Sequence, residues 1–133
     1  MSRDIIHTDN APAAVGTYSQ AVKIDKTVYI SGQIGLDPNT MTLADGFVNQ
    51  ANQVMSNIEA ICQAAGGSLA NVVKFNVSLT DLADFTALNE IFAARLSAPY
   101  PARAAVQVAA LDRKSGSAGM PRPSSVSRMP SSA

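Results

Sequence analysis

Arg103 is the residue in this sequence whose type and position most clearly suggest chemistry. It lies in the apolar stretch ARAAVQVAAL, residues 102–111, where strand alternation puts it on the same face as Ala105 and Gln107. A guanidinium among small residues keeps its charge and therefore needs an anionic partner, and its planar fork suits a carboxylate. From strand position alone, a ligand carboxylate and a structural ion pair with Asp or Glu are equal alternatives.

Three other places are candidates for a small-ligand site. Tyr18 follows a loop glycine in GTYSQA, although a core ring with its hydroxyl at the surface is the reading that the sequence alone favours. The stretch SGQIG, residues 31–35, ends a predicted strand, and Gly32 has no side chain to keep a ligand away from the backbone amides. Asn89 lies inside a predicted helix, where it is either a solvent-facing residue or an anchor for a loop.

The other reactive side chains give little support for covalent or metal chemistry. Cys62 is the single cysteine, which excludes an internal disulfide, and it lies on the apolar face of a predicted helix, where a buried, inert thiol is expected. His7 has no predicted partner, so a Ser-His-Asp arrangement is not indicated. One cysteine and one histidine are too few soft ligands for a zinc site, and we expect no metal.

Length and composition describe one domain followed by an unusual C-terminus. With 133 residues, 47% of them hydrophobic, the chain can bury a single core, and its zero net charge gives no indication of a nucleic-acid or membrane partner. Residues 113–133 contain seven Ser, three Pro, two Gly, four basic side chains and no acidic one. We therefore expect residues 1–112 to fold and residues 113–133 to form a disordered tail.

The N-terminal residues carry no sign of export. They include acids where a secretory signal has a basic and then an apolar stretch, and no apolar run approaches the ~20 residues that span a bilayer. Together with the single cysteine, this predicts a cytoplasmic protein.

The spacing of apolar residues predicts the order hairpin, helix, strand, helix, strand. Such an order requires a βαβ crossover, so the fold class is α+β, with a mixed sheet and two helices on one of its faces. The predicted elements are a hairpin within residues 17–35, a helix capped by Asp45 and ended by Gly66 and Gly67, a strand within 71–81, a helix capped by Asp81 and stopped by Pro99 and Pro101, and a strand over 102–111.

Each element has a face that is expected to be buried. The sheet face opposite the two helices is too apolar to be exposed to water, and another copy of the chain is the simplest layer to cover it. The first helix should bury Ala51, Val54, Met55, Ile58, Ile61, Cys62 and Ala65; the middle strand Val73, Phe75, Val77 and Leu79; and the second helix Phe85, Leu88, Phe92, Arg95 and Leu96.

Several stretches together resemble the RidA (YjgF) family of reactive-intermediate or imine deaminases, whose members are also known as L-PSP endoribonucleases or translation inhibitors. The resemblance runs from about residue 4 to Leu111 and implies a chorismate-mutase-like α+β domain that assembles as a homotrimer with clefts between subunits. The stretches that carry it are NAPAAVGTYSQAV, YISGQIG, GGSLANVVKFNVSLTDLADFTALNEIF and PARAAVQVAAL.

The family resemblance implies a function and a set of site residues. Members hydrolyse enamines and imines such as 2-aminoacrylate to 2-keto acids and ammonia, without a metal or an organic cofactor. By motif, Arg103 would hold the substrate carboxylate and Tyr18 would act with it in catalysis. Ser31 and the backbone around Gly32 would line the cleft, and Asn89 would help to hold it.

The C-terminus departs from the family pattern. After Leu111 the family continues into a last strand of the type VEIEAIAV, whose second glutamate orients the attacking water, whereas this chain has no acid after Asp112. The last family strand is thus expected to be replaced, and catalysis is expected to lack this carboxylate. A shifted reading frame or replaced segment and a divergent natural tail are both open explanations.

Two other functions stay open at this point. The same cleft could serve a protein that binds small carboxylates without catalysis or that acts as a regulator. An endoribonuclease or translation inhibitor is the other alternative. Residues 1–112 have six basic and ten acidic side chains and no basic stripe with stacking aromatics, so the sequence gives RNA binding little support.

Overall fold

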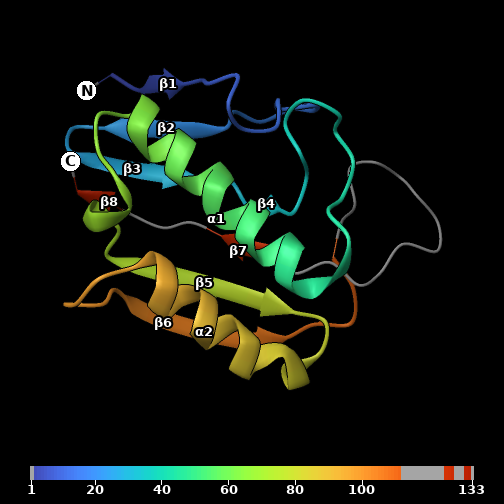
Figure 1. Cartoon of the computed structure of the whole chain (residues 1–133). Helices are drawn as coiled ribbons and strands as arrows, with labels where there is room; N and C mark the ends of the chain where they lie inside the picture. The colour runs from blue at the N-terminus through green and yellow to red at the C-terminus, as the bar shows by residue number, and fades with distance from the viewer. Residues whose placement is uncertain (1, 112–124, 128–130, 133) are drawn as a thin grey trace.

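The computed structural model describes residues 2–111, 125–127 and 131–132. It contains short strands, two α-helices and two 3-10 turns (Figure 1). In chain order these are β1 (Asp4–Ile6), β2 (Ala21–Ile24), β3 (Thr27–Ile30), β4 (Gln33–Ile34), α1 (Gly46–Ala64), η1 (Leu69–Asn71), β5 (Lys74–Leu79), η2 (Leu82–Asp84), α2 (Phe85–Arg95), β6 (Ala102–Gln107), β7 (Ser125–Ser127) and β8 (Ser131–Ser132).

The strands form two four-stranded sheets rather than the one sheet that the sequence predicts. One sheet has the order β1-β2-β3-β8 and the other the order β4-β7-β5-β6, and the chain passes between them at Ser31 and Gly32. The pair β5–β6 is parallel and the other pairs are antiparallel, so the predicted mixed strand arrangement is confirmed. Both helices lie in front of the strands (Figure 1), which confirms the predicted α+β class.

Helix α1 follows its apolar pattern closely. Val54, Met55 and Ile61 have no exposed surface, and the other expected core residues of this helix are buried as well. Asp45 is the N-cap residue, although its side chain makes no capping hydrogen bond, and Gly66 adopts a φ of 93° just after the helix. Within the described residues, no helix is long and apolar enough to cross a membrane.

Parallel pairing of β5 and β6 decides which way Arg103 points. Phe75 and Val77 are buried beneath the helices, and Arg103 pairs with Phe75 in the register. Arg103 therefore lies on the helix side of the sheet. The expectation for Val73 is wrong: its side chain is 49% exposed, because it precedes the strand and contributes only its carbonyl, which accepts a hydrogen bond from Ala102.

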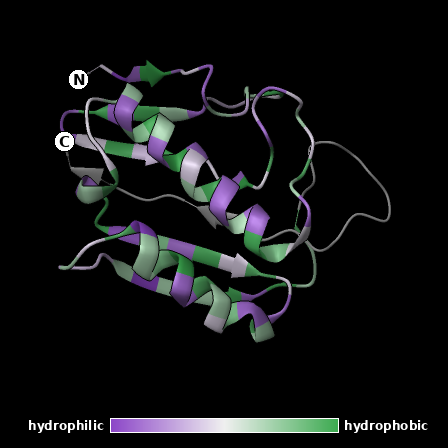
Figure 2. Cartoon of the chain, in the orientation of Figure 1, coloured by the Kyte–Doolittle hydropathy of each residue, from purple (hydrophilic) through white to green (hydrophobic). Residues whose placement is uncertain are grey.

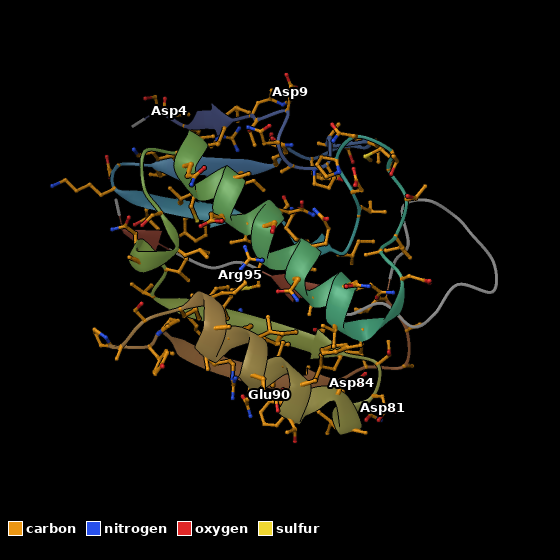
Figure 3. All side chains as sticks on the ribbon, in the orientation of Figure 1. Asp4, Asp9, Asp81, Asp84, Glu90 and Arg95 are labelled. Carbon is orange, nitrogen blue, oxygen red and sulfur yellow. The ribbon has the colours of Figure 1, made fainter. Side chains whose placement is uncertain are left out.

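The second predicted helix is divided into a 3-10 turn and α2. Asp81 caps the turn by accepting a hydrogen bond from the backbone N–H of Ala83 at 2.9 Å. Arg95 lies between α1 and α2 (Figure 3), where it donates to the carbonyl of Asn52 at 2.9 Å and is 3.5 Å from Glu59. This arginine therefore ties the two helices together, and Leu88, Ile91 and Phe92 form the buried face.

The sheet face opposite the helices is exposed in a single chain. Tyr29 on β3 and Val106 on β6 are 47% and 53% exposed. Strands β2, β3 and β5 contain hydrophobic residues (Figure 2), but only the side chains that face the helices are fully buried. The exposed apolar side chains agree with the expectation that this face needs a further layer.

Two pieces of the C-terminal segment are strands. β7 pairs with both β4 and β5, and β8 pairs with β3. For these five residues the structure differs from the predicted disorder. Their backbone groups pair with strands that are distant in the sequence, and local composition does not reveal such partners. The rest of that prediction, for residues 113–124, 128–130 and 133, lies outside the described residues.

The central place of β7 gives a stability prediction. Val126 pairs with Gln33 on one side and Val77 on the other, so Val126→Pro removes an N–H from the interior of a sheet. We expect the free energy of unfolding to fall by about 2 to 3 kcal/mol and Tm by roughly 10 °C, measured by thermal denaturation. Val126→Thr keeps the N–H and serves as control. Equal melting of all three proteins would show that β7 contributes nothing.

Candidate functional site

Arg103 is held against helix α2 by three side chains. Its Nη1 donates to Asn89 Oδ1 at 2.7 Å. Its guanidinium carbon lies 4.8 Å from the ring centroid of Phe85 and 5.5 Å from that of Phe92. A cation over aromatic rings is attracted to their π faces, so the rings and the amide together fix the position of the guanidinium while it keeps its charge.

The local sequence explains this arrangement. Phe85, Asn89 and Phe92 are spaced four and three residues apart on α2 and therefore share one face of the helix. The ring of Phe92 also packs against that of Phe75, with centroids 5.1 Å apart. Asn89 is exposed to solvent, which agrees with the first of its two predicted alternatives, and its Oδ1 also accepts a hydrogen bond from Arg103, which neither alternative included.

A pocket of about 420 Å³ opens beside Arg103. Arg103 forms no ion pair with any Asp or Glu of the part of the chain that the structure describes. The structural alternative for this arginine therefore has no partner there, and a guanidinium at the edge of a pocket with both apolar and polar walls suits a small carboxylate with a hydrocarbon portion. The pocket is lined by Asn89, Phe92, Ala93, Leu96, Tyr100, Pro101 and Arg103.

Tyr18 and Ser31 form a second group at the beginning of β2 and the end of β3. Ser31 Oγ donates to the carbonyl of Ser19, next to Tyr18, at 2.6 Å. The Tyr18 hydroxyl accepts a hydrogen bond from the backbone N–H of Val15 at 3.4 Å, and the tyrosine is 40% exposed. Gly32 follows Ser31 where the chain leaves β3.

One chain does not bring the two groups together. β6, which carries Arg103, is the edge strand of its sheet, whereas β2 and β3 belong to the other sheet (Figure 1). None of Tyr18, Ser31 and Gly32 lines the pocket at Arg103. The structure therefore joins Arg103 to Asn89, and it joins Ser31 to the neighbour of Tyr18, but it keeps the two groups apart.

The remaining reactive side chains lie outside both groups. Burial, and to a smaller extent the charge of Glu59, raises the pKa of Cys62 to about 11, so its thiol is protonated at neutral pH. His7, for which no partner was expected, lies 3.1 Å from Asp9 on the surface. The described residues contain no group of three or more His, Cys, Asp or Glu side chains that could hold a metal ion.

Sequence reasoning missed six residues around Arg103, among them Ala93 and Leu96 of the pocket wall. Phe85 and Phe92 were assigned only to the core, although both lie against the guanidinium. Tyr100 and Pro101 also line the pocket, and Pro101 was recognised only as a helix stop. The spacing of Phe85, Asn89 and Phe92 was a usable signal, because it places an amide between two aromatic rings on one helix face.

Comparison with protein families and curated proteins gives consistent matches. The chain matches the family described as Endoribonuclease L-PSP over residues 8–116. It is 51% identical to 2-iminobutanoate/2-iminopropanoate deaminase of Mus musculus, over 85% of this chain and 84% of that protein. The human protein of the same name is 49% identical over 85% of this chain and 83% of its own length.

Solved structures match nearly the whole chain. RidA from Psychrobacter sp. PAMC 21119 is 62% identical, with a TM-score of 0.86 over 98% of this chain and 99% of that chain. Escherichia coli TdcF, solved with bound serine, is 33% identical, with a TM-score of 0.82 over 98% of each chain. The family match ends at residue 116, close to the change in composition after residue 112.

The contact between Asn89 and Arg103 predicts an effect on carboxylate binding. Asn89→Leu keeps the shape of the side chain but removes the acceptor, so Arg103 loses part of its preorganisation. We expect the Kd for pyruvate, measured by calorimetric titration, to rise about fivefold, the equivalent of one hydrogen bond of about 1 kcal/mol. Asn49→Leu makes the same change on the exposed surface of α1 and is the control. Equal rises in both variants would contradict the assignment.

Proposed function

Because the chain belongs to the Endoribonuclease L-PSP family, which is the RidA family indicated by its motifs, we propose that it hydrolyses enamines and imines of small 2-amino acids, such as 2-aminoacrylate, to 2-keto acids and ammonia. The observation that carries this proposal is Arg103, fixed by Asn89 at the edge of a pocket. Relatives about 50% identical are named 2-iminobutanoate/2-iminopropanoate deaminase, and these names match the predicted deaminase-type hydrolase.

Substrate binding follows from the charge and shape of the pocket. The guanidinium of Arg103 pairs with the substrate carboxylate, and the apolar wall that includes Phe92 and Leu96 accommodates the hydrocarbon portion. Because substrate and 2-keto acid product share this carboxylate, the product is expected to bind the same site. Arg103 thereby orients the reacting carbon next to the carboxylate.

The reaction needs few protein groups. The enamine tautomerises to an imine; water then adds to the C=N carbon, its oxygen forming the new bond while a proton passes to nitrogen. The carbinolamine collapses to C=O as its hydroxyl proton passes to nitrogen, the C–N bond breaks and ammonia leaves. Water is the nucleophile and the C=N carbon is already electrophilic, so no cofactor is called for. We assign proton transfer to the Tyr18 hydroxyl and the lining of the cleft to Ser31 and the backbone at Gly32.

The site requires two copies of the chain in this proposal. Tyr18, Ser31 and Gly32 flank the strands of one sheet and Arg103 lies on the edge strand of the other, so contact with a second copy is what brings them together. A homotrimer with its clefts between subunits satisfies this requirement and covers the exposed face that carries Tyr29 and Val106. A cytoplasmic location, and the lack of nucleic-acid and membrane partners, remain predictions.

One observation favours an alternative function without catalysis. No carboxylate lines the described pocket, and residues 113–133 contain no acid, so the glutamate that orients water in the family has no counterpart. A chain that binds small carboxylates without turnover, as a binding or regulatory protein, is the alternative. The ribonuclease alternative has no comparable support, because the pocket carries a single cation.

A coupled assay tests the proposal. A dehydratase generates 2-aminoacrylate, and the acceleration of 2-keto acid release is measured with wild type and with Arg103→Ala. We expect Arg103→Ala to lose about 100-fold or more in kcat/KM, since a charge-assisted pair of about 3 kcal/mol is lost. Arg95→Ala is the control, because it removes another arginine that does not line this pocket.

The outcomes separate the alternatives. Acceleration by wild type and by Arg95→Ala, but not by Arg103→Ala, supports the enzyme. Release that is equal with and without wild-type protein overturns it. In that case, pyruvate binding that is lost in Arg103→Ala supports the non-catalytic alternative.

A further inference from the structure

Gln20 is a buried amide whose role the proposed reaction does not yet explain. Its side chain is 3% exposed. Its Oε1 accepts a hydrogen bond from the backbone N–H of Thr8 at 2.7 Å. Its Nε2 lies within hydrogen-bond distance of three carbonyls, those of Thr8 at 3.0 Å, Ala11 at 3.2 Å and Pro12 at 2.8 Å. One side chain therefore holds residues 8–12 at several points.

The same residue is tied to Ser31 through its backbone. The carbonyl of Gln20 accepts a hydrogen bond from the N–H of Ser31 at 3.0 Å. The carbonyl of the preceding residue, Ser19, accepts from Ser31 Oγ at 2.6 Å. Gln20 thus links residues 8–12, through its side chain, to the end of β3, through its main chain.

Tyr18 lies in the loop that these contacts close. Residues 13–19 connect the segment pinned by the Gln20 amide to the beginning of β2, so both ends of this loop are fixed. Inside the loop, the N–H of Val15 donates to the Tyr18 hydroxyl. The loop also passes close to the tyrosine ring, since a Cβ on Gly16 would lie 3.4 Å from it. The position of Tyr18 therefore depends on where residues 11 and 12 are held.

We propose that Gln20 is a positioning residue whose side chain holds the Tyr18 loop in the arrangement that the reaction uses. This inference rests on the proposed function for its catalytic consequence. Gln20 is buried and does not line the pocket, so it acts through Tyr18 rather than on the substrate. Among the amino acids, only Asn and Gln carry an uncharged amide with both an acceptor oxygen and two N–H donors, and Asn is shorter by one methylene.

Gln20→Met tests this role because it keeps length and burial but removes both polar ends. The control is Gln50→Met. Gln50 is also fully buried, but its one hydrogen bond goes to the carbonyl of Ala44, away from the Tyr18 loop. Both substitutions are expected to lower Tm, so activity is measured well below the melting transition of each variant.

A double-mutant cycle with Tyr18→Phe separates positioning from general stability. We expect Gln20→Met to lower kcat at least tenfold while KM, which is governed by Arg103, changes less than twofold. In the Tyr18→Phe background the same substitution should change kcat less than twofold, because the group that Gln20 positions is already lost. Gln50→Met should leave kcat within twofold of wild type. An equal effect of Gln20→Met in both backgrounds, or an unchanged kcat, overturns the proposal.

Amide hydrogen exchange gives a second readout that needs no turnover. In Gln20→Met, exchange at Thr8, whose N–H donates to the Gln20 side chain, should accelerate at least tenfold, while the amides of α1 keep their wild-type rates. Unchanged exchange at Thr8 shows that the Gln20 side chain does not hold the loop and overturns the proposal by itself. The two failures are distinguishable. If wild type shows no turnover but exchange accelerates in Gln20→Met, the proposed function is overturned while Gln20 still holds this loop.

Discussion

The structure depends on the way in which a permanent positive charge is held at the edge of an apolar core. Arg103 cannot lose its proton, and the described residues offer it no carboxylate partner. It is kept in place by a hydrogen bond to Asn89 and by the faces of Phe85 and Phe92. This requires β6 to run parallel to β5 with α2 packed over both, which is the crossover that the chain forms between these strands.

The same crossover leaves β6 at the edge of its sheet, whereas Ser31 follows a hairpin of the other sheet. A residue on an edge strand is open to contact with another copy of the chain. The exposed strand face, with Tyr29 and Val106, points to the same conclusion from burial alone. β7 lies inside one sheet and β8 at the edge of the other, so the five described residues of the compositionally unusual segment pair with strands of both sheets.

Local patterns predicted what depends on local physics. The 3.6-residue period identified α1, and the alternation of Phe75, Val77 and Leu79 identified β5 and its buried face. The same patterns could not predict β1 or β7, which are three residues long and exist because distant strands offer backbone partners. For the site, residue types singled out Arg103 and Asn89 separately, but their contact depends on the packing of α2 over β6, which no short window contains.

The central claim is that Arg103 of one chain works with Tyr18 of another, and subunit mixing tests it most directly. Arg103→Ala and Tyr18→Ala chains, each inactive alone, are unfolded and refolded together, and 2-keto acid release from 2-aminoacrylate is measured. A shared site predicts that the mixture regains about a quarter of the wild-type rate, since roughly one interface in four then combines an intact Arg103 with an intact Tyr18. A mixture no more active than the two separate preparations would contradict the account.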